Sequence, residues 1–105
     1  MNGPRVLVVG RECRVVAAVV RAVRGHGVAA VGATADADAL REIDAGPVAL
    51  LVLGAGVEPA SRELLRRRTG EGAGRVVETP LRGGDIEEYV RREILGPLRA
   101  GPDSG

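Results

Sequence analysis

Hydrophobic residues form four short blocks along the chain, and each block is followed by a stretch with a different spacing. The blocks are nearly uninterrupted in apolar residues, which is typical of strands buried on both faces of a parallel sheet. They cover residues 5–10, 28–33, 48–53 and 75–78, and the block VALLVL at 48–53 is the most hydrophobic. The pattern therefore predicts four parallel strands.

The segments between the blocks repeat their apolar residues at helical spacing. The first helix is predicted from Arg11 to the ending Gly25-His26-Gly27, and its inner face is formed by Val15, Val16, Val19, Val20 and Val23. Glycine in that ending is a common helix stop, because it adopts backbone angles that other residues avoid. We therefore expect an amphipathic helix directly after the first strand.

The three later helices are marked by their first residues. Thr34 or Asp36 is expected to cap a short helix that ends at Gly46-Pro47, and Glu58-Pro59 begins the next, with proline in the first turn. The last helix begins with Asp85 and Glu88, which have the spacing of a capping box. The predicted inner faces are Ala39, Leu40 and Ile43, then Leu64 and Leu65, then Ile86, Tyr89, Val90 and Ile94.

Four strands that alternate with helices define the fold class. Parallel neighbours need crossover helices, and these crossovers are right-handed, so the helices cover both faces of the sheet. The sequence predicts one three-layer, doubly wound α/β domain over residues 1–99, with strand order 2-1-3-4 and a disordered tail at 100–105.

Composition narrows the classes of function. The 105 residues carry a net charge of only +1, so the strong positive electrostatic field of a nucleic-acid-binding protein is not expected. One Tyr is the only aromatic residue, so a surface on which bases could stack is not expected either. One Cys and one His cannot form a disulfide or a zinc set, so we expect no metal and no cofactor in a cytoplasmic protein. No apolar run is long enough to cross a membrane.

The candidate site follows from the strand order. Ligands of doubly wound sheets bind at the carboxyl ends of the strands where the order reverses, here between strands one and three. Glycine turns, an arginine and a helix N-terminus at that place could accept a phosphate or a carboxylate. The residues expected to line this crevice are Gly10, Arg11, Glu12, Cys13, Gly54, Gly56 and Glu58.

Each candidate residue also has a structural interpretation. The glycines can simply turn the chain while Arg11 pairs with Glu58 or Glu12, since neither nucleotide-binding glycine pattern is present. Cys13 at a helix start could be a reactive thiolate, but the only histidine, His26, lies at the other end of that helix. The run 66–68 of three arginines is typical of a solvated helix end.

Several segments together resemble a known family, the response-regulator receiver domain, which has a flavodoxin-like fold. They are RVLVVGRE, GHGVAAVGATADADAL, PVALLVLGAGVEP and VVETPLRGGDIEEYVRREI, within residues 5–95. A full receiver has five βα units, so one unit is missing here. VGR after the first strand and GAGVEPASR after the third also resemble small stand-alone receiver-like bacterial proteins.

The resemblance implies a phosphotransfer site whose residues this chain has replaced. Receivers hold Mg²⁺ beside a phosphorylatable aspartate, and the acid pair of that site falls here on Gly10 and Arg11. The acceptor falls on Gly54, and the lysine falls on Thr79. Since no carboxylate can accept the phosphoryl group, the resemblance points to a pseudo-receiver that is not phosphorylated.

These observations favour a non-catalytic regulatory or scaffolding module that acts through protein contacts. An enzyme is disfavoured because the sequence has no acid–base pair, metal cluster or nucleophile with a base. The alternative is a small anion- or nucleotide-binding protein that uses the crevice. The missing unit leaves an edge strand and apolar helix surface less well covered, so we expect a homodimer through the sheet edge or the last helix, with Tyr89 and Ile94 near the contact.

Overall fold

The computed structural model describes residues 5–46, 48–54, 56–70, 75–78 and 85–96. The four strands are β1 (Arg5–Val9), β2 (Ala30–Ala33), β3 (Val48–Leu53) and β4 (Arg75–Val77). The helices are α1 (Cys13–Gly25), α2 (Asp36–Ala45), α3 (Pro59–Gly70) and α4 (Ile86–Tyr89), and α4 continues into the π-helical turn η1 (Val90–Leu95). The predicted order of elements is therefore confirmed.

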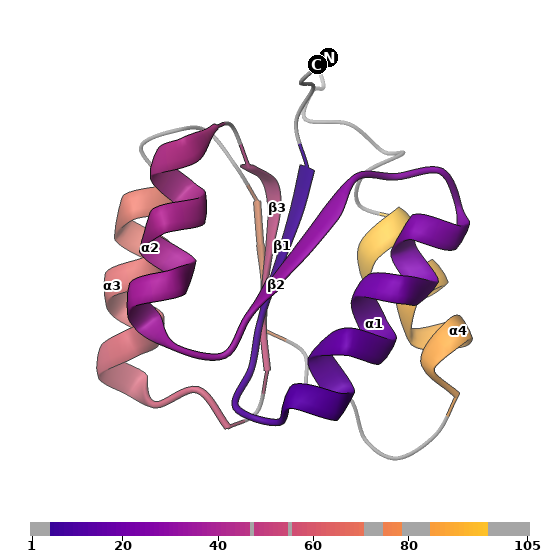
Figure 1. Ribbon diagram of the computed structural model, residues 1–105, viewed down its shortest axis with the longest axis horizontal. Helices are drawn as coiled ribbons and strands as arrows, with labels where there is room; N and C mark the ends of the chain where they lie inside the picture. The colour runs from indigo at the N-terminus through magenta and orange to yellow at the C-terminus, as the bar shows by residue number, and fades with distance from the viewer. Residues whose placement is uncertain (1–4, 47, 55, 71–74, 79–84, 97–105) are drawn as a thin grey trace.

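The strands form one parallel sheet in the order β2-β1-β3-β4, as predicted. The sheet lies between two helical layers in a flavodoxin-like arrangement, with α2 and α3 on one face and α1 and α4 on the other (Figure 1). β1 pairs with β2 from Val6 to Val9 and with β3 along its whole length. The sheet therefore has two edge strands, β2 and β4.

Burial on both faces explains why the strands are apolar without alternation. In β1, Val6 and Val8 pack toward α1 and α4, while Leu7 and Val9 pack toward α2 and α3. All four are at most 4% exposed. Since each fully buried aliphatic side chain contributes about 1.5–3 kcal/mol, this strand is one of the main sources of stability.

The buried faces of the helices agree with the sequence prediction except at Val15 and Leu64. Val16, Val19 and Val23 of α1 are buried, but Val15 is 39% exposed. The prediction that Leu64 faces inward was wrong, because it is 37% exposed. The inner row of α3 has a spacing of four residues and consists of Ser61, Leu65 and Thr69.

The expected caps are found at one helix and not at another. The Asp85 carboxylate accepts a hydrogen bond of 3.0 Å from the backbone N–H of Glu87 at the start of α4. At α2 the cap position is Ala35, and no side chain caps the helix. The prediction of a Thr34 or Asp36 cap was wrong because the Asp36 carboxylate is bound by side chains from two other segments.

Two of the expected features lie outside the described residues. The tail at 100–105 and Thr79 are not described. Among the described residues, no helix is both long enough and apolar enough to cross a membrane.

Gly32 lets α1 approach the edge strand β2, and this contact is testable. A Cβ atom at Gly32 would lie 2.5 Å from Cγ1 of Val16 and 3.2 Å from Cγ2 of Val20. Gly32→Ala should therefore lower the free energy of unfolding by about 1–3 kcal/mol in urea denaturation. In a Val16→Ala background, where the closest methyl group is gone, the same substitution should cost less than about 1 kcal/mol.

Gly25→Ala is the matched control, because a Cβ at this helical glycine would meet nothing within 4 Å. It should leave stability unchanged or raise it by up to about 1 kcal/mol. Equal losses for Gly32→Ala in both backgrounds would contradict the proposed contact.

Candidate functional site

The crevice at the carboxyl ends of β1 and β3 encloses a cavity of about 170 Å³. It forms here because the chain leaves these two neighbouring strands toward opposite faces of the sheet, from β1 to α1 and from β3 to α3. No helix can cover the point where the connections diverge. The fold therefore places the cavity at the predicted location.

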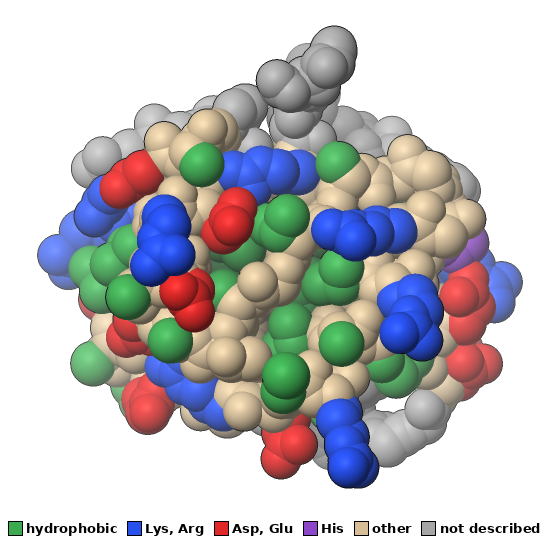
Figure 2. All heavy atoms as spheres, in the orientation of Figure 1, with side chains coloured by type: hydrophobic (Ala, Val, Ile, Leu, Met, Phe, Trp, Pro, Cys, Tyr) green, Lys and Arg blue, Asp and Glu red, His purple; other side chains and the backbone are tan. Residues whose placement is uncertain are grey.

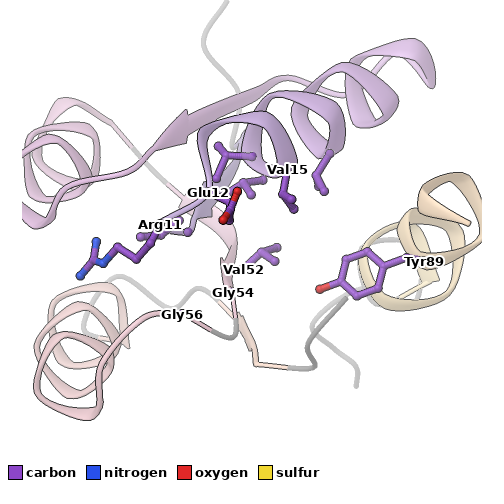
Figure 3. A pocket seen from close by; sticks show the side chains of 12 residues that line it. Arg11, Glu12, Val15, Val52, Gly54, Gly56 and Tyr89 are labelled. Atoms are coloured by element: carbon purple, nitrogen blue, oxygen red, sulfur yellow. The ribbon is translucent and has the colours of Figure 1, made fainter. Parts of the chain in front are cut away.

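The walls of the cavity are mainly apolar. Figure 3 shows the side chains of Val15 and Val52 and the ring of Tyr89 around the opening. Val8, Val16 and Val19 complete this wall. Burial, with a smaller effect of the nearby Glu93 carboxylate, raises the pKa of the Tyr89 hydroxyl. The phenol is therefore neutral near pH 7 and cannot act as a base there.

Arg11 lines this cavity, but its guanidinium is directed away from Val15 and Tyr89 (Figure 3). Nη2 donates to Asp36 Oδ1 at 2.8 Å and to Glu58 Oε1 at 2.7 Å. Nη1 donates to the Thr34 carbonyl at 2.9 Å. The guanidinium is thus bound by two carboxylates and a carbonyl of the protein itself.

A serine completes this ionic cluster, which we define as Arg11, Asp36, Glu58 and Ser61. The Ser61 hydroxyl donates to Asp36 Oδ2 at 2.6 Å, and it lies 3.2 Å from Nη2 of Arg11. The cluster joins the segment after β1, the start of α2 and the start of α3. These three places are far apart in sequence but meet at one edge of the parallel sheet.

The hydrogen bonds of the cluster shift the protonation of its members. The Ser61 hydroxyl, and then the Arg11 guanidinium, lower the pKa of the Asp36 carboxyl. Arg11 also lowers the pKa of Glu58, and the hydrogen bonds that Arg11 donates to Asp36 and Glu58 raise the pKa of Arg11. The cluster is therefore fully charged near neutral pH and holds one cation against two anions.

Two backbone donors of the crevice, the amides of Gly10 and Gly54, are also engaged within the fold. The Gly10 N–H donates to the Ala33 carbonyl at 3.2 Å, and the Gly54 N–H donates to the Val9 carbonyl at 2.8 Å. An anion that used these amides would have to replace sheet hydrogen bonds. Both glycines therefore act here as continuations of the strands.

Arg62 fixes the other side of the crevice. Its guanidinium donates to the carbonyls of Val57 at 2.8 Å and Gly54 at 3.0 Å, and to Glu78 Oε1 at 2.9 Å. The segment after β3 is thereby tied to the end of β4. Like Arg11, this arginine stabilises connections between strands and helices.

The structure separates the predicted site residues into three groups. Gly10, Arg11, Glu12, Gly54 and Gly56 line the cavity. Glu58 belongs to the ionic cluster. Cys13 is exposed and lies in a different groove, between α1 and β2.

The remaining polar candidates are engaged elsewhere. Nε2 of His26 contacts the Glu87 carboxylate, which joins the end of α1 to α4. The arginines of the 66–68 run pair with acids on α3, on α2 and after β4. In the described part of the chain, no group of three or more His, Cys, Asp or Glu side chains is arranged to hold a metal ion.

Sequence reasoning did not identify Asp36, Ser61 or the apolar wall formed by Val52 and Tyr89. Asp36 could have been found, because it closely follows the second strand and so reaches the same edge of the sheet as Arg11. Ser61 carries no such signal, since its place depends on how α3 rotates against the sheet. The predicted Arg11–Glu58 pairing is present.

Comparison with models of protein families and with curated proteins gives no match for this chain. The resemblance to receiver domains therefore stays a prediction, and the structure supports the fold class on its own.

The ionic cluster predicts a specific dependence of stability on pH. Since the pKa of Asp36 is lower in the folded state, its contribution is fully present above the unfolded pKa and is lost as pH falls through the folded pKa. Asp36→Asn should therefore destabilise the protein at pH 7, by about 1 kcal/mol given the partial exposure of the pair. From about pH 4 downward the wild-type and variant stabilities should converge.

Asp38→Asn is the control on the same helix, because Asp38 pairs with Arg41 at 3.4 Å on the exposed surface. It should change the free energy of unfolding by less than about 0.5 kcal/mol at pH 7. A difference between wild type and Asp36→Asn that stays constant from pH 7 to pH 2 would contradict the role of the charged cluster.

Proposed function

We propose that this chain is a non-catalytic, receiver-like regulatory or scaffolding module of the cytoplasm that acts through protein contacts. The observation that carries the proposal is the position of the Arg11 guanidinium between Asp36 and Glu58. A built-in cation at this edge of the sheet pairs with both acids, and the cluster keeps one uncompensated negative charge. Each acid therefore already has a cationic partner from the protein itself.

The geometry gives less support to the alternative of an anion or nucleotide site. An incoming phosphate would have to compete with two carboxylates for Arg11, and these lie at 2.8 and 2.7 Å. The cluster carries one positive and two negative charges, so its field repels an anion. The apolar cavity beside it instead suits a small apolar group, such as a side chain of a partner protein.

We also propose that the module forms a homodimer through the free edge of β4. Tyr89 and Ile94 are 5% and 0% exposed, and both lie in the core beneath α1. Their side chains are therefore unavailable as the direct contact. The outer side of β4 has no strand partner among the described residues, and an unpaired edge is a common surface for pairing two copies.

Acetyl phosphate with Mg²⁺ should leave the intact mass of the protein unchanged, because Gly54 offers no carboxylate at the acceptor position. Intact-mass spectrometry at neutral pH is the measurement, and an authentic receiver domain treated in the same way shows that the reagent is active. A phosphoryl adduct that survives at neutral pH but is lost in acid or base would show that an aspartate still accepts the group.

Light scattering should give twice the mass of the chain across the micromolar range, since pairing through β4 would satisfy the hydrogen-bonding groups of its outer edge. Measurement at several concentrations separates a stable dimer from nonspecific association. A monomeric mass at every concentration would overturn the dimer and leave the module monomeric.

A further inference from the structure

The second edge of the sheet, formed by β2, has features that the proposed function does not use. β2 lies at the end of the sheet beside β1. The carbonyls of Ala29 and Ala33 accept hydrogen bonds from β1, so by the alternation of a strand the backbone groups of Ala30 and Gly32 point away from the sheet. This edge therefore presents outward-pointing backbone groups that no other described strand pairs.

A groove runs between this edge and α1. It has a volume of about 310 Å³ and is lined by small or apolar side chains, together with Cys13, Thr34 and Asp38. Figure 2 shows hydrophobic side chains along the middle of this face, with basic side chains over α1 to one side of them. β2 consists of Ala, Val and Gly, so its own side chains are small.

Two of the basic side chains beside the groove have no acidic partner among the described residues. Arg14 and Arg21 are exposed and pair with no carboxylate in the part of the chain that the structure describes. On the α2 side the acids are compensated, because Asp38 pairs with Arg41 and Glu42 pairs with Arg5. The α1 side of the edge therefore carries an uncompensated positive charge.

Arg24 connects this charge to the free backbone. Its Nε donates to the Ala30 carbonyl at 3.0 Å, which is one of the outward-pointing groups of β2. The guanidinium thus occupies the place of the backbone N–H that a neighbouring strand would supply. A carboxylate is a stronger partner for arginine than a carbonyl, so an acidic strand could draw Arg24 away and bond to Ala30 itself.

We propose that the β2 edge binds an extended acidic segment of a partner protein, which adds a fifth strand to the sheet. The dimensions agree: Arg14 to Arg24 spans about 15 Å of helix, and residues i to i+4 of a strand span about 13 Å. Acidic residues at alternate positions would all face the arginines of α1. This inference rests on the proposed function, because it names the partner of a module that acts through protein contacts.

A second copy of the chain fits this edge less well. Two β2 edges that pair antiparallel about a two-fold axis keep each α1 on the same face of the joined sheet. The uncompensated arginines of both copies would then face each other. Like charges make that arrangement unfavourable, whereas an acidic partner is attracted.

The test uses the full chain labelled with ¹⁵N and a blocked peptide of seven residues, alternating Glu and Val. Heteronuclear NMR should show shifts at the amides of Ala30 and Gly32 and slower hydrogen exchange at both, because new backbone hydrogen bonds form there. The same peptide with Lys in place of Glu should bind at least about tenfold more weakly. Bound Glu peptide should also slow the reaction of Cys13 with a maleimide, since this single thiol lies in the groove.

The double variant Arg14→Glu/Arg21→Glu should weaken binding of the Glu peptide about tenfold. Arg67→Glu/Arg91→Glu is the matched control, because both arginines are exposed on other helices and the change in net charge is the same. The control should change the affinity less than about twofold at 0.15 M salt, where distant charges are screened.

Four results would overturn the inference. They are equal binding of the Glu and Lys peptides, shifts confined to residues outside β2 and α1, tighter binding of a single-stranded oligonucleotide at the same amides, and protection of Ala30 and Gly32 by increasing protein concentration alone. None of these results adds a phosphoryl group to the chain. Failure of this inference is therefore distinct from failure of the proposed function, which the intact mass would reveal.

Discussion

The Arg11 guanidinium between two carboxylates is the interaction on which the candidate site depends. Asp36 and Glu58 begin different helices, and Arg11 holds both within 2.8 Å. The parallel sheet makes this possible, because all its strands end at the same edge and their connections meet there. Without a cation at this position, two acids would face each other across the end of β1. Arg11 therefore stabilises the connections and also gives the crevice its electrostatic character.

The same use of arginine recurs around the sheet. Arg5 binds the Glu42 side chain and backbone, Arg24 binds a β2 carbonyl, and Arg62 binds two carbonyls and Glu78. A guanidinium has several donors in one plane, so one side chain can join a loop carbonyl to a carboxylate. The core is nearly all aliphatic and provides few polar contacts to fix the loops. Arginine supplies that specificity at the surface, where the 15 basic residues are nearly balanced by 14 acidic ones.

The fold was predictable from the sequence because burial on both faces leaves a continuous apolar signal. Strands at 48–53 and 5–10, and their order in the sheet, followed from that signal and from the handedness of crossovers. The details that were missed depend on the rotation of individual helices. Leu64 is exposed because the buried face of α3 is the row Ser61, Leu65 and Thr69. Which face of the helix is buried depends on its packing against the sheet and not on the local order of apolar residues.

The site was only partly predictable for a related reason. The location of the crevice and the Arg11–Glu58 pair follow from topology and charge, and the same topology brings Asp36 to this edge, although its hydrogen bond to Ser61 could not be foreseen. From the sequence alone, Asp36 was expected as a possible N-terminal cap of its own helix. Its hydrogen bond with Ser61 depends on the tertiary structure. Tyr89 was expected on the inner face of the last helix and is buried there, but its part in the cavity wall opposite α1 was not foreseen.

The two edges of the sheet differ in a way that bears on assembly. β2 and β4 lie at opposite ends, so pairing through one leaves the other open. A dimer joined at β4 would carry two β2 edges at its far ends, each beside an uncompensated row of arginines on α1. Two linked acidic segments could then bind both ends at once, and the second binding step would be intramolecular. Symmetric pairing and recognition of an acidic strand are therefore compatible in one particle, because each uses a different end of the sheet.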